Sequence, residues 1–350
     1  MNKIIFLVAG GTGGHLFPAI AVSEFFKKSQ LHFLVDKRTE NFLINKNLKY
    51  HVISSSKFEK NIFKLPISFF KIFYGFIYSF YLIVKFKPSL VVGFGGYTSI
   101  PSLLAAKFLN RKILIHEQNS VMGKTNRFLS KISNKIAVTY KDTVFAHKSA
   151  IFSGIPIREF RLKKSSNKNK NKNKKILIIG GSQGAKILSK IVKNIILRLD
   201  KSLLKKIIVV QQIRKEDLKE MEKFYKDLNV KFKLENFFTN IYDEINTSDI
   251  IISRCGASSL AEIEYFKKFC ILVPLPSSAN NHQYFNAIEF KKTDDCEIIN
   301  QCNIDNQNLV KIIKSNLFKN KKKFKKQERK LERKTKKMSL ENIINDMVKK

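Results

Sequence analysis

The sequence predicts an α/β protein made of two Rossmann-like, doubly wound parallel-sheet domains that face each other across a cleft. The first observation is Lys3–Phe26, where an apolar run leads into a glycine turn and then into helically spaced apolar residues. The second is a copy of this pattern in Lys174–Val192, displaced by 170 residues (Gly10 to Gly180). The third is the length of 350 residues, which exceeds the roughly 250 to 300 that one core usually serves.

Further strands are expected where short apolar runs alternate with helix-length segments, as in a parallel sheet with crossover helices. In the first half they cover 4–9, 31–35, 51–53, 90–92, 112–116 and 135–138. In the second half they cover 175–179, 207–211, 230–234, 250–253, 271–273 and 297–299. A lysine-rich helix is expected over 319–337, and Ser339 is expected to cap a last helix over 340–348.

The segment 163–175 marks the predicted domain boundary, because it has no apolar residue and cannot offset its ordering entropy by burial. We expect a first domain over 1–160 and a second over 176–338. A nucleic-acid arm is the alternative for this segment, although such arms usually carry arginines or aromatic residues, and this one has neither.

The composition implies attraction to polyanions, because the formal net charge is +38. The alternative is that an AT-rich genome favours lysine throughout the protein, since the lysines are spread over the whole chain.

The four cysteines form no C-x-x-C pair and have no histidine at metal-ligand spacing. This pattern indicates a reduced, cytoplasmic chain without a bound metal. Met1 leads straight into a strand, so no cleavable signal is expected.

The phenylalanine-rich segment 62–86 has two interpretations. Its longest uncharged stretch lies between Lys71 and Lys85, short of the roughly 18 to 20 residues of a membrane span. A span would also separate strands 51–53 and 90–92, which fit one sheet. We therefore expect either a helix lying in the interface of an anionic membrane or an unusually apolar crossover helix packed on the sheet.

The turn Gly10–His15 is the first candidate for chemistry. Its four glycines let a phosphate or sugar approach the backbone, and the helix that follows offers free amides. His15 adds a titratable group. Neither this turn nor Gly180–Gly184 has the G-x-G-x-x-G fingerprint, which disfavours a dehydrogenase, although Asp36 ends the second strand where such enzymes bind ribose.

Two more polar clusters of the first half follow predicted strands, at the ligand edge of a doubly wound sheet. Tyr97 lies in GFGGYTSIP beside glycines that allow close approach of a ligand, and HEQN at 116–119 follows the next strand. Strand capping is the alternative role for these polar residues. The segment SGIPIR ends in Arg158, whose guanidinium can hold a phosphate bidentately.

In the second half, SRCGASSLAE at 253–262 contains Gly256 at a helix start whose amides can meet an anion. Glu262 lies about two turns into this helix, where its carboxylate can accept hydrogen bonds from sugar hydroxyls. His282 and Gln283 add an acceptor and an amide.

The motifs GGTGGH, GGY-x-S-x-P, HEQN, G-x-P-x-R, GGSQGA and the helix start ending in Glu262 occur in this order over essentially the whole chain. In this combination the chain resembles the MurG peptidoglycan glycosyltransferases, which move N-acetylglucosamine from UDP-GlcNAc to lipid I and make lipid II. The resemblance implies a GT-B fold, an acceptor and membrane-associating first domain, a donor-binding second domain, and a last helix (339–350) that packs back on the first.

The resemblance also implies the site residues. The residues similar to the family's UDP-GlcNAc contacts are Thr12, Gly13, Gly14, Asn119, Arg158, Ser182, Phe238, Ala257, Ser258, Ser259, Leu260, Ala261, Glu262 and Gln283, with Glu262 on the ribose. His15 matches the family's candidate base, and His116 and Glu117 are the alternatives. Cys255 replaces a common serine, and Pro276–Ser278 also departs from the family pattern.

The chemistry of glycosyl transfer requires a base for the acceptor hydroxyl and stabilisation of the leaving diphosphate. No D-x-D pair is present to hold Mg²⁺, so helix N-termini and Arg158 are expected to stabilise that charge without metal or cofactor. Direct attack would invert the anomeric centre.

A polyprenyl acceptor would place the enzyme peripherally on the cytoplasmic face of the inner membrane. Another lipid glycosyltransferase, such as a diacylglycerol glycosyltransferase, is the first alternative, and a nucleic-acid-binding protein is the remote one.

Overall fold

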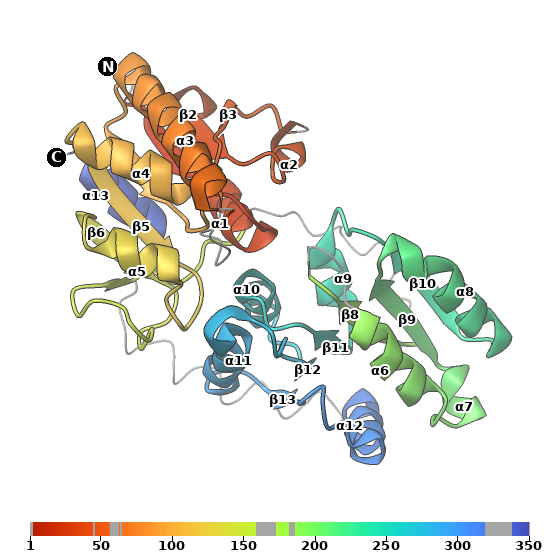
Figure 1. Ribbon diagram of the computed structural model, residues 1–350. Coiled ribbons are helices and arrows are strands. Elements are labelled where there is room, and N and C mark those ends of the chain that lie inside the picture. Colours follow the sequence, from red (N-terminus) through yellow and green to blue (C-terminus); the bar gives the residue numbers. More distant parts are fainter. Residues whose placement is uncertain are drawn as a thin grey trace. The chain divides into compact units, whose positions relative to one another are not determined.

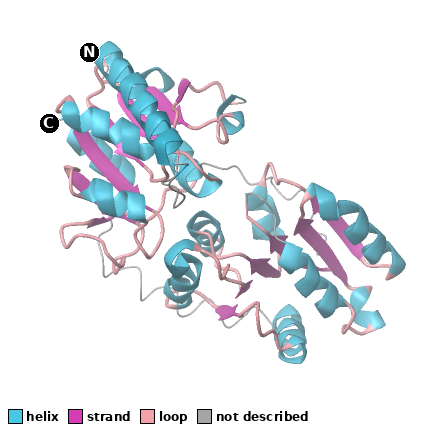
Figure 2. Cartoon of the chain, in the orientation of Figure 1, coloured by secondary structure: helices cyan, strands magenta, loops and turns pink. Residues whose placement is uncertain are grey.

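The computed structural model describes residues 3–44, 46–56, 63, 65–158, 173–181, 186–318 and 338–349 (Figure 1). The chain divides into two compact units, here called the N-terminal unit (Met1–Glu159 with Lys337–Lys350) and the C-terminal unit (Phe160–Lys336). Each contains one parallel sheet with helices beside it (Figure 2). The predicted helix 319–337 and residues 163–172 of the predicted linker lie outside the described residues.

The N-terminal unit has a seven-stranded sheet of order β3-β2-β1-β4-β5-β6-β7. Its strands are β1 (Ile5–Val8), β2 (Leu31–Val35), β3 (Tyr50–Val52), β4 (Leu90–Gly93), β5 (Lys112–Glu117), β6 (Lys135–Val138) and β7 (Ile151–Phe152). Its helices are α1 (Gly13–Ser23), α2 (Asn41–Ile44), α3 (Leu65–Phe86), α4 (Ser99–Phe108), α5 (Lys124–Ser130) and α13 (Leu340–Lys349). The six predicted strands are present within one or two residues of their expected bounds, whereas β7 was not predicted.

The C-terminal unit has a six-stranded sheet of order β10-β9-β8-β11-β12-β13. Its strands are β8 (Lys174–Ile179), β9 (Ile207–Gln212), β10 (Lys231–Glu235), β11 (Ile250–Ser253), β12 (Cys270–Leu272) and β13 (Cys296–Ile298). Its helices are α6 (Lys186–Ile196), α7 (Lys201–Leu204), α8 (Leu218–Asp227), α9 (Ile241–Thr247), α10 (Ala257–Tyr265), α11 (His282–Lys291) and α12 (Asn306–Phe318). Because β8 begins at Lys174, the last two residues of the predicted linker belong to this strand.

Both sheets reverse their strand order next to their first strand. The chain adds β2 and β3 on one side of β1 and then crosses to β4 on the other side. The C-terminal unit repeats this reversal between β8 and β11. In open parallel sheets, ligands bind outside the carboxyl ends of the strands at such a switch point. The loops after β1, β4, β8 and β11 are therefore where a site is expected.

The core of the N-terminal unit lies on both faces of its sheet. Ile5 and Leu7 of β1 pack in one cluster with residues of α1, whereas Phe6 and Val8 pack in another with residues of α3 and α4. The helix α13 also buries its apolar side in the first of these clusters, through residues that include Ile343. The end of the chain is thus part of the N-terminal unit, as Figure 1 shows by the blue helix among orange and yellow elements.

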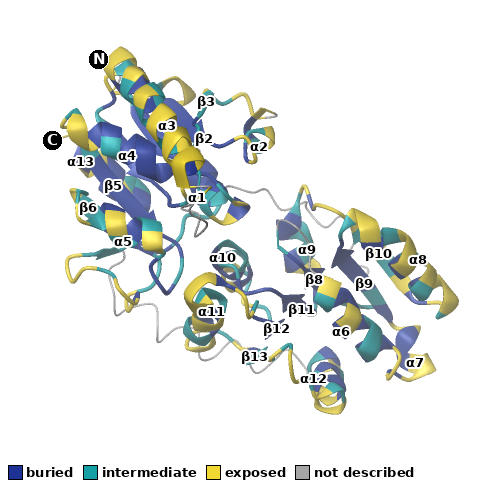
Figure 3. Ribbon diagram, viewed as in Figure 1, coloured by how far each residue is buried: buried dark blue, intermediate teal, exposed yellow. Residues whose placement is uncertain are grey.

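The helix α3 buries one side, formed by the small residues Ser68, Gly75 and Ser79 and, near its end, by Leu82 and Ile83 of the core. A Cβ on Gly75 would lie 2.0 Å from the main-chain oxygen of Ser54, and the Ser79 and Ser102 hydroxyl oxygens are 3.0 Å apart. These contacts bring α3 close to the sheet and to α4. The opposite side of α3 is exposed (Figure 3), and its Phe69, Phe70, Phe73 and Tyr74 are 64%, 68%, 53% and 67% accessible. This outward surface is therefore not part of the core.

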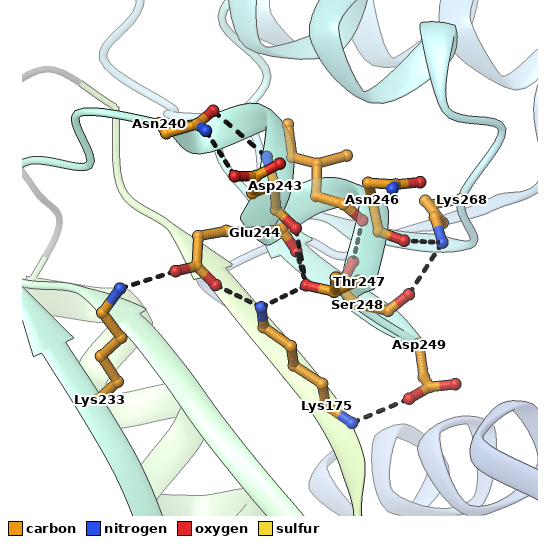
Figure 4. A network of polar contacts seen from close by, with 11 residues as sticks. Lys175, Lys233, Asn240, Asp243, Glu244, Asn246, Thr247, Ser248, Asp249 and Lys268 are labelled. Atoms are coloured by element: carbon orange, nitrogen blue, oxygen red, sulfur yellow. Dashed lines mark hydrogen bonds and ion pairs between the residues drawn. The ribbon is translucent and has the colours of Figure 1, made fainter. Parts of the chain in front are cut away.

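A network of charged side chains fastens α9 to the sheet of the C-terminal unit (Figure 4). The Glu244 carboxylate accepts hydrogen bonds from Lys175 on β8 and, at 2.7 Å, from Lys233 on β10. The Lys175 amide donates to Asp249 at 2.9 Å. Burial acts to raise the pKa of Glu244, but the bonds from both lysines outweigh it and leave this pKa below its ordinary value. Lys175 lies at the amino end of β8, away from the switch point, which indicates a stabilising role.

Two histidines pack together under the end of α3. The rings of His32 on β2 and His51 on β3 are stacked with centroids 5.2 Å apart, and the Phe86 ring lies 4.3 Å from that of His32. Burial, with smaller contributions from the charges of His51 and Lys49, lowers the pKa of His32 from 6.5 to about 4. The pair is thus held uncharged at neutral pH.

We expect the N-terminal unit to lose stability between pH 7 and pH 4. The folded pKa of His32 lies below its unfolded value, so the unfolded chain binds a proton first, and the stabilisation present above pH 6.5 disappears as the pH falls toward 4. The loss from His32 is about 2 to 3 kcal/mol. Urea unfolding at several pH values should show that the free energy of unfolding falls less with decreasing pH in His32→Phe than in the wild type. An equal pH dependence in both proteins would contradict this assignment.

Candidate active site

The loops after β1 and β4 meet at the switch point of the N-terminal unit. A Cβ on Gly96 would lie 2.4 Å from the Gly10 carbonyl oxygen, and one on Gly10 would lie 2.2 Å from the Thr98 hydroxyl oxygen. Gly96 also has φ of +76°, a conformation that favours glycine. The two loops are therefore in contact through their backbones, and a side chain at either glycine would separate them.

The glycine turn is held by Asp36, which follows β2. Its carboxylate accepts a hydrogen bond from the Gly11 amide at 2.8 Å and is also bonded by Arg38 and by the Thr39 hydroxyl. Asp36 is buried. The carboxylate that would bind ribose in a dinucleotide enzyme thus positions the loop in this chain.

The turn ends in the N-terminus of α1, where Thr12 is the N-cap and Gly13 and Gly14 open the first turn. The Thr12 side chain makes no capping hydrogen bond, and the first turn has no acidic residue. The amides and the positive end of the helix dipole are therefore left for an anionic or hydroxyl-rich ligand. Thr12 and Gly14 are exposed, whereas Gly13 is buried.

His15 is half-buried in the first turn of α1 and lies against the loop after β4. Its Cε1 atom would be 3.1 Å from a Cβ on Gly95, which has φ of +92°. Its Nδ1 atom is 2.9 Å from Oε1 of Gln118. The glycine at position 95 thus gives the imidazole its space, and the second ring nitrogen, Nε2, is not used by this bond.

The alternative bases His116 and Glu117 are buried, with 0% and 1% of their surface accessible. His116 Nε2 lies 2.9 Å from the Gly154 carbonyl oxygen. The Glu117 carboxylate accepts hydrogen bonds from the main chain and side chain of Asn119, from the Gly123 amide and, at 2.8 Å, from the Asn126 side chain. Glu117 therefore shapes the loop that presents Asn119, which is half-buried.

Tyr97 and Arg158 lie nearer the surface of the N-terminal unit. Tyr97 is 39% accessible. The Arg158 guanidinium carbon lies 4.9 Å from the ring centroid of Phe17, within the range of a cation–π contact. Since Phe17 follows His15 closely on α1, this contact places the end of SGIPIR beside the same helix.

In the C-terminal unit, α10 begins directly after the switch-point strand β11. Its N-cap is Gly256, and no atom would lie within 4 Å of a Cβ there. Ala257, Leu260 and Ala261 are buried, whereas Ser258 and Ser259 are half-buried. The Glu262 carboxylate accepts a hydrogen bond from the Tyr242 hydroxyl at 3.3 Å. The open helix start and this carboxylate lie on one short helix.

Gln283 joins the two loops beside this helix start. Its Oε1 atom accepts hydrogen bonds from the amides of Cys255, at 3.3 Å, and Leu275, at 3.1 Å. Phe238 is buried, and Gly181 in the loop after β8 has φ of +80°. Ser182 lies outside the described residues. Of the predicted contacts in this unit, Gln283 and the start of α10 thus meet at the loops after β11 and β12, whereas Phe238 follows β10.

The sequence motifs contain Gln118, in HEQN, and Arg254, in SRCGASSLAE, but gave neither residue a role of its own. Arg254 is buried and donates to the carbonyl oxygens of Val273, at 2.9 Å, and Pro274, at 3.1 Å, and to the Gln301 side chain at 2.8 Å. Burial lowers the pKa of its guanidinium. The position of Arg254 directly after a buried strand could have pointed to these contacts, because a buried charge requires hydrogen-bond acceptors.

Among the described residues, no group of three or more His, Cys, Asp or Glu side chains is placed to hold a metal ion.

Comparison with known proteins decides the family. Residues 5–138 match the glycosyltransferase family 28 N-terminal domain, and residues 175–345 match the glycosyltransferase family 28 C-terminal domain. The chain belongs to glycosyltransferase family 28. Both halves of this family 28 chain therefore carry the sequence pattern of one enzyme class, as the resemblance predicted.

Relatives of this family 28 chain carry one name. A protein of Rickettsia bellii is 38% identical over 301 residues, covering 82% of this chain and 83% of its own length. A protein of Wolbachia sp. subsp. Brugia malayi is 34% identical over 348 residues, covering 99% and 97%. Both are named UDP-N-acetylglucosamine--N-acetylmuramyl-(pentapeptide) pyrophosphoryl-undecaprenol N-acetylglucosamine transferase.

Solved structures confirm the predicted GT-B fold of the family 28 chain. Acinetobacter baumannii MurG is similar with a TM-score of 0.70 and 26% identity, covering 89% of this chain and 90% of its own. The glycosyltransferase of kitacinnamycin has a TM-score of 0.66 with 12% identity, covering 90% of each chain, and so shares the fold alone.

Proposed function

We propose that this chain is an inverting glycosyltransferase that moves N-acetylglucosamine from UDP-GlcNAc to the 4-hydroxyl of MurNAc in lipid I and makes lipid II. The observation that carries the proposal is the similarity over 99% of the chain to a transferase named for this reaction. The open helix starts at both switch points and His15 beside one of them support it.

The N-terminal unit supplies the base and the acceptor site. His15 Nε2 accepts the proton of the acceptor hydroxyl as oxygen attacks the anomeric carbon, and the leaving diphosphate departs with the nucleoside. A positioned base of this kind contributes about 10² to 10⁴ in rate. The single displacement inverts the α-linked donor and gives a β-linked product.

The C-terminal unit supplies the donor site. The amides that open α10 stabilise the diphosphate, since helix N-termini favour phosphate. Ser258 Oγ is buried without a hydrogen-bond partner among the described residues, which supports a ligand or solvent contact at this helix start. Glu262 accepts hydrogen bonds from the ribose hydroxyls.

Binding to the membrane follows from α3. A polyprenyl diphosphate acceptor does not leave the bilayer, so the enzyme must bind at its surface. The helix is long and apolar enough to cross a membrane by length and composition, but one of its sides packs on the sheet. We infer that the exposed aromatic side lies in the lipid interface, with Lys71 and Lys85 at anionic headgroups.

Glu262→Ala should raise the KM for UDP-GlcNAc about 10- to 100-fold and change kcat little. A hydrogen bond to a charged group contributes about 1.5 to 3 kcal/mol, which corresponds to this range. Steady-state kinetics at saturating acceptor measure the effect, with Glu264→Ala on an exposed position of the same helix as the control. A KM equal to that of the wild type would contradict the ribose contact.

A transfer assay with radiolabelled UDP-GlcNAc tests the reaction itself. Lipid I and diacylglycerol are offered separately in vesicles, and label in the lipid fraction is measured. Label on lipid I alone supports the proposal, whereas label on diacylglycerol favours the alternative lipid glycosyltransferase. RNA binding that falls steeply with salt, without affinity for UDP, would favour a nucleic-acid-binding protein.

A further inference from the structure

The side chain of Gln118 connects His15 to the interior of the N-terminal unit. It is 1% accessible and follows β5. Its Nε2 atom donates to the His116 carbonyl oxygen at 2.9 Å and lies 3.1 Å from His116 Nδ1, while its Oε1 atom lies 2.9 Å from His15 Nδ1. His116 Nε2 in turn lies 2.9 Å from the Gly154 carbonyl oxygen.

The direction of each hydrogen bond in this series is fixed by the two carbonyl groups. A carbonyl oxygen only accepts, so the end of Gln118 that faces the His116 carbonyl must be its NH₂ group. The other end is then an acceptor, which requires that His15 carries its proton on Nδ1. The same NH₂ group faces His116 Nδ1, so the proton of that ring is on Nε2 and is donated to Gly154.

We propose that Gln118 is a positioning residue that, with His116 behind it, holds His15 in the tautomer with Nδ1 protonated and Nε2 free to accept a proton. This inference rests on the proposed function. His116 and Gln118 are too buried to contact the substrate, so they act through His15. In the serine-protease triad an aspartate has the same task, and loss of the correct tautomer there lowers kcat by about 10⁴.

An amide is suited to this position for an electrostatic reason. A carboxylate beside His15 would favour the charged imidazolium, which cannot accept a proton. The neutral amide orients the ring through a hydrogen bond alone. It also donates to His116, which a carboxylate cannot do. The glutamine of the HEQN segment thus supplies both a donor and an acceptor without adding charge.

The test uses the full chain, with Gln118→Met as an apolar side chain of similar length. We expect kcat to fall about 10- to 100-fold, with the KM for UDP-GlcNAc within twofold of the wild type. Gln118→Glu keeps an acceptor toward His15 but loses the donor toward His116 and favours the charged imidazolium, so its kcat should fall as well. Asn134→Ala removes a side-chain acceptor for the Ile113 amide in the same sheet and should lower Tm without lowering kcat.

Nitrogen NMR of the histidine rings tests the tautomer independently of activity. The His15 signal, assigned by its absence in His15→Ala, should show a proton on Nδ1 in the wild type and a mixture of tautomers in Gln118→Met. A wild-type His15 protonated on Nε2 overturns the inference, even if the variant does not fold. An active wild type with unchanged kcat in folded Gln118→Met also overturns it, whereas a wild type that transfers no label argues against the proposed function instead.

Discussion

His15→Ala should bind UDP-GlcNAc as tightly as the wild type and lose about 10²- to 10⁴-fold in kcat. The reason is that the imidazole lies in the N-terminal unit, against Gly95 and Gln118, whereas the proposed diphosphate and ribose contacts, the start of α10 and Glu262, lie in the C-terminal unit. Losing the base removes proton transfer in the transition state without removing the ribose contact. Calorimetry with UDP-GlcNAc and single-turnover transfer measure the two quantities separately.

His147→Ala is the matched control for His15→Ala. His147 is exposed in the same unit, where its Nδ1 atom lies 2.7 Å from the Ser149 hydroxyl oxygen. This control should leave both donor binding and kcat unchanged. If kcat of His15→Ala equals that of the wild type, His15 has no role in proton transfer. If donor binding is lost together with kcat, the loop after β1 contacts the nucleotide more strongly than we propose.

Replacing Phe69, Phe70 and Phe73 by serine should abolish binding to anionic vesicles. Full burial of one phenylalanine is worth about 1.5 to 3 kcal/mol, so losing three lowers the affinity by more than about 10²-fold. The three rings are 64%, 68% and 53% accessible, so the unit should remain folded. Vesicle co-sedimentation measures binding, and activity on a soluble acceptor analogue should be kept.

Phe128→Ser is the control for this triple substitution. Phe128 is 50% accessible on α5 of the same unit, so it tests whether any exposed phenylalanine contributes to vesicle binding. Binding should be kept in this variant. Unchanged vesicle binding of the triple variant would contradict the membrane role of α3, and loss of its folding would mean that these rings stabilise the unit.

The fold could be predicted because parallel strands buried on both faces must be apolar runs. The segment 4–9 was therefore predicted as a strand, and β1 spans Ile5–Val8 with all four residues buried. β7 was missed because a strand of two half-buried residues has no periodicity. β10 was displaced by one residue, to Lys231–Glu235, because its accessible side chains mark its bounds weakly.

The candidate site was predicted less completely than the fold. Motifs place polar residues at strand ends, and this was enough to select His15, Asn119 and Glu262. Motifs do not show which side chains approach one another in space. Gln118 lies between two histidines, and one of them, His15, comes from a segment 103 positions away in the sequence. Periodicity alone contains no information on such contacts.

The configuration of the new glycosidic bond tests the central claim most directly. The product formed from UDP-GlcNAc and a soluble MurNAc-diphosphate acceptor is isolated, and the proton coupling at its anomeric carbon is measured by NMR. A single displacement assisted by His15 predicts the β configuration, with the same yield in the presence of EDTA. An α-linked product would contradict direct attack by the deprotonated acceptor.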